Sequence, residues 1–166
     1  MTIKHSAAIA AIAMIWSVGA WAQDPPPPTE AQAAPAETPT ATGSEWWVFS
    51  RAPNRHYLID VNSVARTGDE LTVDVARVST ETPAGDYSHS VDQFGIECRG
   101  RRSHVVTSRD AFAEGVLEEA YATDEPWEAI SARSFDDGIR EISCDDMRPQ
   151  PPSWPSIKAY IDAGRP

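Results

Sequence analysis

The clearest pattern in the chain is an alternation of apolar and polar residues over positions 70–80. Leu71, Val73 and Val75 fall on one side of an extended backbone together with Arg77. The residues between them fall on the other side, because successive side chains of a strand point to opposite faces. The pattern predicts a β-strand with one apolar face.

Two further apolar runs precede this strand, EWWVFS at 45–50 and HYLIDV at 56–61. The residues between them favour a turn, so the two runs are expected to form a hairpin. Trp46 and Trp47 are neighbours in the first run and cannot both face the same core. We expect one of the two to be exposed or covered by the preceding segment.

The segment Tyr87 to His104 reads as a strand, a tight turn and the start of a return strand. Phe94, Ile96 and Cys98 fall on the same face, so Cys98 is expected to point into the core. Downstream, residues 109–123 contain good helix formers around a glycine, which could equally separate a loop from a short strand at 116–122; the strand is the preferred interpretation.

One helix is predicted near the end of the apolar pattern. Ser134 is placed to cap it and Asp137 to occupy the third helical position of a capping-box-like start. Phe135, Ile139 and Ile142 fall at helical spacing on one face. We expect that face to lie on the sheet.

The two cysteines, Cys98 and Cys144, allow a single intramolecular pairing. In an exported chain they are best interpreted as a disulfide, which would stabilise the fold by about 4 kcal/mol. Cys144 ends the predicted helix, so the bond would clamp the helix onto the sheet. The predicted fold class is α+β: a small antiparallel β-sheet with one C-terminal α-helix packed on it and linked to it by the disulfide.

Composition divides the chain into four parts. Residues 1–22 have a basic start, an apolar run and an Ala-x-Ala end typical of a cleaved signal peptide, and the run is too short to span a membrane. Residues 23–43 are expected to be a proline-rich, disordered linker. The domain is expected to cover 44–148, and 149–166 to be a proline-rich tail.

The net charge is -11, and removal of residues 1–22 would take away Lys4 and no acid. Such an acidic chain makes nucleic acid and anionic membrane surfaces poor partners. We expect a protein or another envelope component as partner, no membrane span after cleavage, and a periplasmic or secreted location.

One basic spot stands out, the turn that carries Arg99, Arg101 and Arg102. Guanidinium groups suit carboxylates and sulfates, so this turn is a candidate docking site for an acidic partner. The simpler interpretation is a solvated hairpin turn whose arginines pair with acids nearby.

Candidate catalytic and metal-binding patterns are weak. His56, His89 and His104 are isolated and lack metal-ligand spacing. Ser88 and His89 would point to opposite faces of a strand, which disfavours a nucleophile triad. We therefore predict no catalytic, cofactor-binding or metal-binding residues, and no cofactor.

The motifs WWVFS, YLIDVNSV, GIECRGRR and PWEAISARSFDDGIREISC extend from Trp46 to Cys144. On these motifs, the chain resembles the surface-adhesin protein E-like domain family of Gram-negative bacteria. The resemblance implies a small antiparallel sheet with a helix and a disulfide, and it suggests matrix-protein adhesion. The family's namesake is a lipoprotein, whereas this chain has no cysteine at its signal junction.

The function expected from the sequence is that of an exported, non-enzymatic interaction domain of the cell envelope, similar to surface-adhesin protein E. The alternative is an envelope enzyme or metal-binding protein whose site assembles only in three dimensions. Homodimerisation through an exposed sheet edge is a further alternative for this chain.

Overall fold

The computed structural model describes residues 43–166. The predicted signal peptide and the predicted linker up to residue 42 lie outside the described residues, so both stay predictions. Within residues 43–166, no helix is long and apolar enough to cross a membrane.

The described chain folds into nine strands and two short helices. Their order and bounds are β1 (Trp46–Ala52), β2 (Arg55–Asp60), β3 (Ala65–Thr67), β4 (Glu70–Ser79), β5 (His89–Glu97), β6 (Arg102–Ala111), β7 (Tyr121–Ala122), β8 (Glu128–Ala129), α1 (Phe135–Cys144), β9 (Ser153–Trp154) and α2 (Ile157–Asp162).

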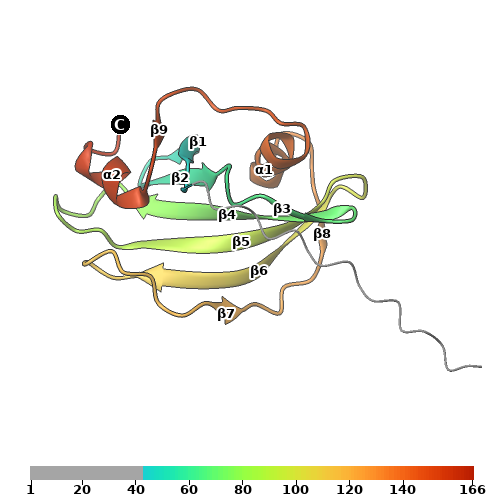
Figure 1. Ribbon diagram of the computed structural model, residues 1–166, viewed down its shortest axis with the longest axis horizontal. Helices are drawn as coiled ribbons and strands as arrows, with labels where there is room; N and C mark the ends of the chain where they lie inside the picture. Colours follow the sequence, from blue (N-terminus) through green and yellow to red (C-terminus); the bar gives the residue numbers. More distant parts are fainter. Residues whose placement is uncertain (1–42) are drawn as a thin grey trace, which may run out of the picture. The chain divides into compact units, whose positions relative to one another are not determined.

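All strands belong to one sheet in the order β7-β6-β5-β4-β2-β1-β9, with β3 paired to β4 and β8 paired to β6 (Figure 1). Every pairing is antiparallel. The predicted hairpin forms as β1 and β2, the alternating segment forms β4, and Tyr87 to His104 contains β5 and the start of β6. The strand expected at 116–122 is reduced to β7 and an isolated bridge at Leu117.

Helix α1 begins where the capping pattern predicted. The Ser134 hydroxyl accepts a hydrogen bond of 3.1 Å from the Asp137 backbone N–H. Hydrogen bonds from the Arg133 backbone N–H and the Arg140 guanidinium lower the pKa of Asp137, which keeps this first-turn carboxylate ionised. Ile139 and Ile142 are buried against the sheet, as their spacing predicted.

Two hydrophobic cores lie on opposite faces of the sheet, because the strands alternate. On β2, Ile59 joins the core under α1 while its neighbour Leu58 joins the core under α2. Figure 1 shows the two helices near opposite ends of the strands. Each helix thus covers one half of a different face.

The two cores also place the adjacent tryptophans. Trp46 is buried in the core under α2, and Trp47 packs half-buried against the core under α1. Neither tryptophan is exposed, because the sheet has a core on both faces at this point. The alternative, cover by the linker, concerns residues outside the described range and stays a prediction.

The stretch 149–166, expected to be a proline-rich tail beyond the domain, contains β9 and α2. Trp154 in β9 pairs with Trp46 in β1, and Tyr160 in α2 is 0 % exposed. The Ser156 hydroxyl caps α2 by accepting a hydrogen bond of 3.0 Å from the Ala159 N–H. These residues supply the second core, so the domain continues through α2.

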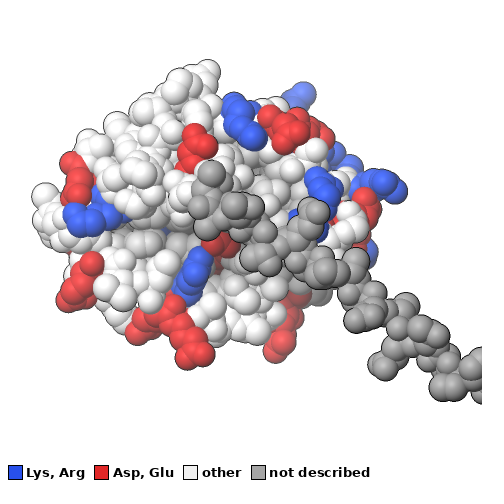
Figure 2. Space-filling model, in the orientation of Figure 1, with Lys and Arg blue, Asp and Glu red and all other residues white. Residues whose placement is uncertain are grey.

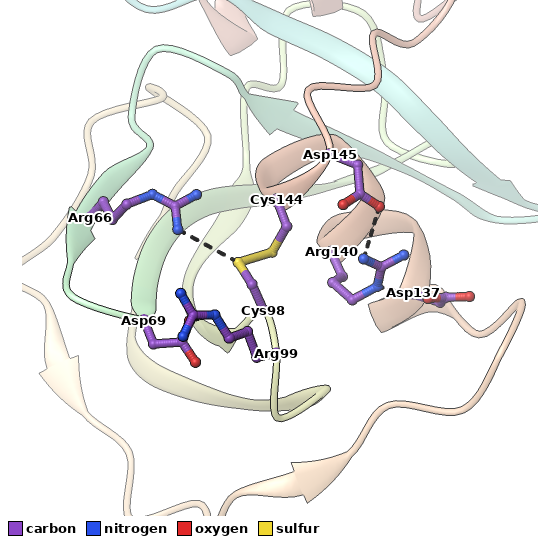
Figure 3. The surroundings of a disulfide bond; sticks show 8 residues. All are labelled: Arg66, Asp69, Cys98, Arg99, Asp137, Arg140, Cys144 and Asp145. Carbon is purple, nitrogen blue, oxygen red and sulfur yellow. Dashed lines mark hydrogen bonds and ion pairs between the residues drawn. A yellow bond between two sulfur atoms is a disulfide. The ribbon is translucent and has the colours of Figure 1, made fainter.

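The predicted disulfide is present. Cys98 follows β5 and Cys144 ends α1, with their Cα atoms 5.8 Å apart and a sequence separation of 46. Figure 3 shows the bond joining the helix end to the sheet. Both half-cystines pack against the core under α1.

The predicted α+β class, a small sheet with one C-terminal helix, is wrong. The described residues form a mainly β fold with a nine-stranded sheet, and helix is confined to the short α1 and α2. The prediction failed because the edge strands are too short to leave a period-two pattern, and because prolines hid the apolar spacing of α2.

We expect Tyr160→Ala to lower the free energy of unfolding by roughly 3–5 kcal/mol, because it empties the centre of the core under α2. The matched control, Lys158→Ala on the exposed side of the same helix, removes exposed contacts with Asp162 and with the Tyr87 hydroxyl and ring, and should have a much smaller effect because it leaves the core filled. Urea unfolding monitored by tryptophan fluorescence measures both. Equal effects of the two substitutions would show that α2 is not part of the cooperative core.

Replacing both Cys98 and Cys144 by Ser should lower the free energy of unfolding by about 4 kcal/mol, because the unfolded chain regains the freedom that the cross-link removes. Chemical denaturation with and without reductant provides the measurement. Reductant should destabilise the natural chain and leave the double variant unchanged. If complete reduction, verified by mass, leaves the unfolding midpoint in place, the expected contribution is refuted.

Candidate functional site

Helix α1 covers only one half of its face of the sheet. The covered half carries apolar residues, and the uncovered half carries polar ones. Along β4, Leu71, Val73 and Val75 lie under α1, and the next residue on the same face is Arg77. On the antiparallel strand β5, Phe94 and Ile96 lie on that face under α1, and Asp92, two residues before Phe94, lies on the same face beyond the helix. The register of the two strands brings these charged side chains together.

The centre of this open area is a chain of three polar side chains from three neighbouring strands. The Ser108 hydroxyl of β6 donates a 2.6 Å hydrogen bond to Asp92 Oδ1. Arg77 contacts the same carboxylate through two atoms, with Nε 3.2 Å from Oδ2 and Nη2 3.3 Å from Oδ1. Asp92 and Ser108 are buried. The buried carboxylate is thus satisfied on both oxygens, as a buried charge requires.

Aromatic side chains form a wall beside this chain. Phe135, the first residue of α1, has its ring centroid 4.8 Å from that of Tyr57 on β2 and 6.1 Å from that of Phe94 on β5. Tyr121 of β7 is 54 % exposed at the sheet edge. The Ser134 cap fixes where α1 starts, and thereby where the ring of Phe135 lies.

These groups line a hollow of about 500 Å³, which we call the Arg77 groove. Its lining combines the aromatic wall and the polar chain with Val105, Thr123 and Glu125. A second hollow of about 390 Å³, the polar hollow, adjoins the groove and shares Arg77 with it; its other lining residues are Asn54, Arg55, Ser79, Glu81 and Ser90. A concave site with apolar walls and a few converging polar groups is typical of ligand binding.

The polar chain in the Arg77 groove holds the Ser108 hydroxyl and the Asp92 carboxylate in a fixed arrangement. The Ser108 proton is directed to Asp92, whose charge is in turn neutralised by Arg77. The serine holds the carboxylate in place.

The predicted basic turn lies elsewhere, between β5 and β6. Each of its arginines pairs with a carboxylate of the same domain: Arg99 with Asp69 at 3.3 Å, Arg101 with Asp137 at 2.9 Å, and Arg102 with Glu97 through Nε at 2.9 Å. Arg99 and Asp69 lie beside the disulfide in Figure 3. On the face drawn in Figure 2, acidic and basic groups are interspersed.

This geometry matches the simpler interpretation of the basic turn, an exposed hairpin turn whose arginines pair with local acids. Arg99 is the most exposed of the three, with 89 % of its side chain accessible. Partner binding by Arg99, Arg101 and Arg102 stays a prediction.

The three histidines lie apart from one another. His56 Nδ1 is hydrogen-bonded to the Tyr160 hydroxyl, and His89 Nδ1 lies 2.7 Å from the Tyr87 carbonyl oxygen. His104 stacks on Trp127 with ring centroids 4.0 Å apart. Burial lowers the pKa of both His56 and His89, and nearby arginines lower both further.

A small cleft of about 160 Å³ brings His104 near Glu125, Glu128 and Asp136. Nε2 of His104 is turned toward Gly95, where a Cβ atom would lie 2.6 Å from it. Among residues 43–166, no group of three or more His, Cys, Asp or Glu side chains is arranged to hold a metal ion.

Comparison with known proteins returned no match: no family model, no curated protein and no solved structure matches this chain. The resemblance to the surface-adhesin protein E-like domain therefore stays a prediction that rests on the sequence motifs.

Sequence reasoning did not identify the Arg77 groove. A signal was present, because Arg77 and Asp92 both continue an apolar face of their strands, where a charged residue needs a partner. The register that pairs them, and the position of Ser108 beyond a bulge in the β5–β6 ladder, depend on tertiary structure.

The lowered pKa values of His56 and His89 predict that stability falls as the pH drops below about 6.5, the pKa of an unperturbed histidine. Below that pH the two histidines bind protons in the unfolded chain more readily than in the folded chain, which favours unfolding. Well above that pH the histidines are neutral in both states, and stability no longer depends on pH through them. Urea unfolding between pH 8 and pH 6 tests this dependence.

A double variant with His56→Gln and His89→Gln should flatten the dependence, while Arg66→Gln, which changes an exposed charge without removing a histidine, should preserve it. An unchanged slope in the double variant would contradict the assignment.

Proposed function

We propose that this protein is an exported, non-enzymatic interaction domain of the cell envelope, similar to the surface-adhesin protein E-like domains, and that it binds its partner at the Arg77 groove. The observation that carries the proposal is the Ser108–Asp92–Arg77 chain, which holds an arginine in a fixed orientation at the open part of the sheet face. A pre-oriented side chain loses little freedom on binding.

Export is supported by the disulfide and by the signal-like residues 1–22. A cross-link between Cys98 and Cys144 persists in an oxidising compartment and is rare in the cytosol. The proposal places the protein in the periplasm or outside the cell. Cell fractionation with sequencing of the N-terminus should give a mature chain that starts at Gln23.

The binding proposal is tested by photo-crosslinking in intact cells, with a photoreactive residue at Glu81 on the rim of the polar hollow. The matched control places the same residue at Arg66, which is exposed on β3. Mass spectrometry should identify envelope components that are captured from position 81 and not from position 66, and Arg77→Lys should reduce their capture. The same set of crosslinks from both positions would contradict the proposal.

A further inference from the structure

Arg77 uses only one side of its guanidinium group to contact Asp92. The contacting atoms are Nε and Nη2, which form one edge of the planar group. Nη1 makes no hydrogen bond to any residue in the described part of the chain, and 42 % of the side chain is accessible. The end of the guanidinium fork, formed by Nη1 and the second proton of Nη2, is therefore free to bind another carboxylate in a bidentate manner.

Arg77 is held by a buried carboxylate that is itself hydrogen-bonded to a buried serine, whereas an ordinary surface ion pair has no such buried partners. Exposed pairs contribute little to stability and need no buried partner. Here Asp92 is 7 % exposed as a residue, and its carboxylate is fixed from behind by Ser108, which is 5 % exposed. Such a buried support limits the rotation of the guanidinium, as a binding site needs.

Apolar surface adjoins this arginine. Tyr57 is the direct neighbour of Arg77 across the β2–β4 ladder, and the ring of Phe135 packs against Tyr57. The groove volume of about 500 Å³ falls within the range of small-molecule sites. A ligand that fits both features carries a carboxylate directly beside an aromatic or branched apolar group.

The acids around the groove restrict the ligand further. Glu81 lines the polar hollow on one side of Arg77, and Glu125 lines the Arg77 groove on the other. Both oppose a second negative charge on the ligand. The site therefore suits a monocarboxylate.

We propose that the Arg77 groove binds a small monocarboxylic acid with an aromatic or branched apolar group, either free or as the C-terminal residue of a peptide. The ligand carboxylate binds the free end of the Arg77 fork, and its apolar group lies against Tyr57 and Phe135. This inference rests on the proposed function, because it assigns a ligand class to the same groove.

The first test compares ligands on the natural, disulfide-bonded chain by NMR titration. N-acetylphenylalanine should bind, and N-acetylphenylalaninamide, which lacks only the carboxylate, should bind about 10- to 100-fold more weakly because a charge-assisted bidentate contact is lost. N-acetylaspartate, a diacid without an apolar group, should not bind. Equal binding of the acid and the amide, or no binding of the acid, would overturn the proposal.

A pair of peptides separates the two sources of the carboxylate. Gly-Gly-Phe with a free C-terminus should bind. The amidated form of the same peptide is the control. Binding of the free peptide that is tighter than that of N-acetylphenylalanine assigns the site to peptide C-termini, whereas tighter binding of the acetylated amino acid assigns it to free acids; both results support the shared chemistry.

The second test uses Arg77→Lys, which keeps the charge but loses the fork, with Arg66→Lys as the matched control. Arg77→Lys should weaken binding of N-acetylphenylalanine at least tenfold, and Arg66→Lys should leave it unchanged. Unfolding midpoints of both variants establish that the fold persists. Should Arg77→Lys not fold, the comparison of acid and amide on the natural chain still decides.

The outcomes separate this inference from the proposed function. If N-acetylphenylalanine fails to bind while position 81 still captures envelope components, the ligand class is wrong and the interaction domain stands. If both experiments fail, the proposed function fails with it.

Discussion

The structure depends on one geometric constraint, the two-sidedness of its central strand. β4 lies in the interior of the sheet, so both of its faces must be covered, and it contributes Val73 and Val75 to one core and Ala76 and Val78 to the other. The covering helices come from separate parts of the sequence and cover different halves. Because neither reaches across the whole sheet, half of the α1-side face stays open.

That open half explains why charged residues stand in strands that are otherwise apolar. At the position where α1 no longer covers the sheet, Arg77 and Asp92 take the place of the apolar side chains that lie next to them on the same face of β4 and β5. The carboxylate is buried by the neighbouring strands and is satisfied by Ser108 and Arg77. The fold thus produces a polar, orienting surface beside aromatic residues. The Ser134 cap fixes the end of α1 that borders this surface, and the disulfide at Cys144 fixes the other end of the helix.

Local patterns predicted local structure well. The alternation over 70–80, the cap at Ser134 and the pairing of Cys98 with Cys144 all correspond to observed features, because each depends on the geometry of a few residues or on the only available partner. The groove could not be predicted in this way. It requires the register of three strands and a bulge, which single-strand patterns do not contain.

The C-terminal part was missed for a different reason. Prolines flank β9, and their density resembles that of a linker, but Ile157, Tyr160 and Ile161 have the spacing of one helix face. The proline-rich composition of residues 149–166 outweighed the helical spacing of these three apolar residues. The same error concealed the second core, in which Trp46 is buried.

The position of α2 near the end of the described residues affects when the core beneath it can form. Leu58 and Val78 share a core with Tyr160 and Ile161, residues that lie much further along the chain. A chain that emerges with its N-terminus first, from a ribosome or across a membrane, holds the aliphatic side chains of β2 and β4 without their cover until residue 161 has appeared. The core under α2 can therefore be completed only after residue 161 has emerged.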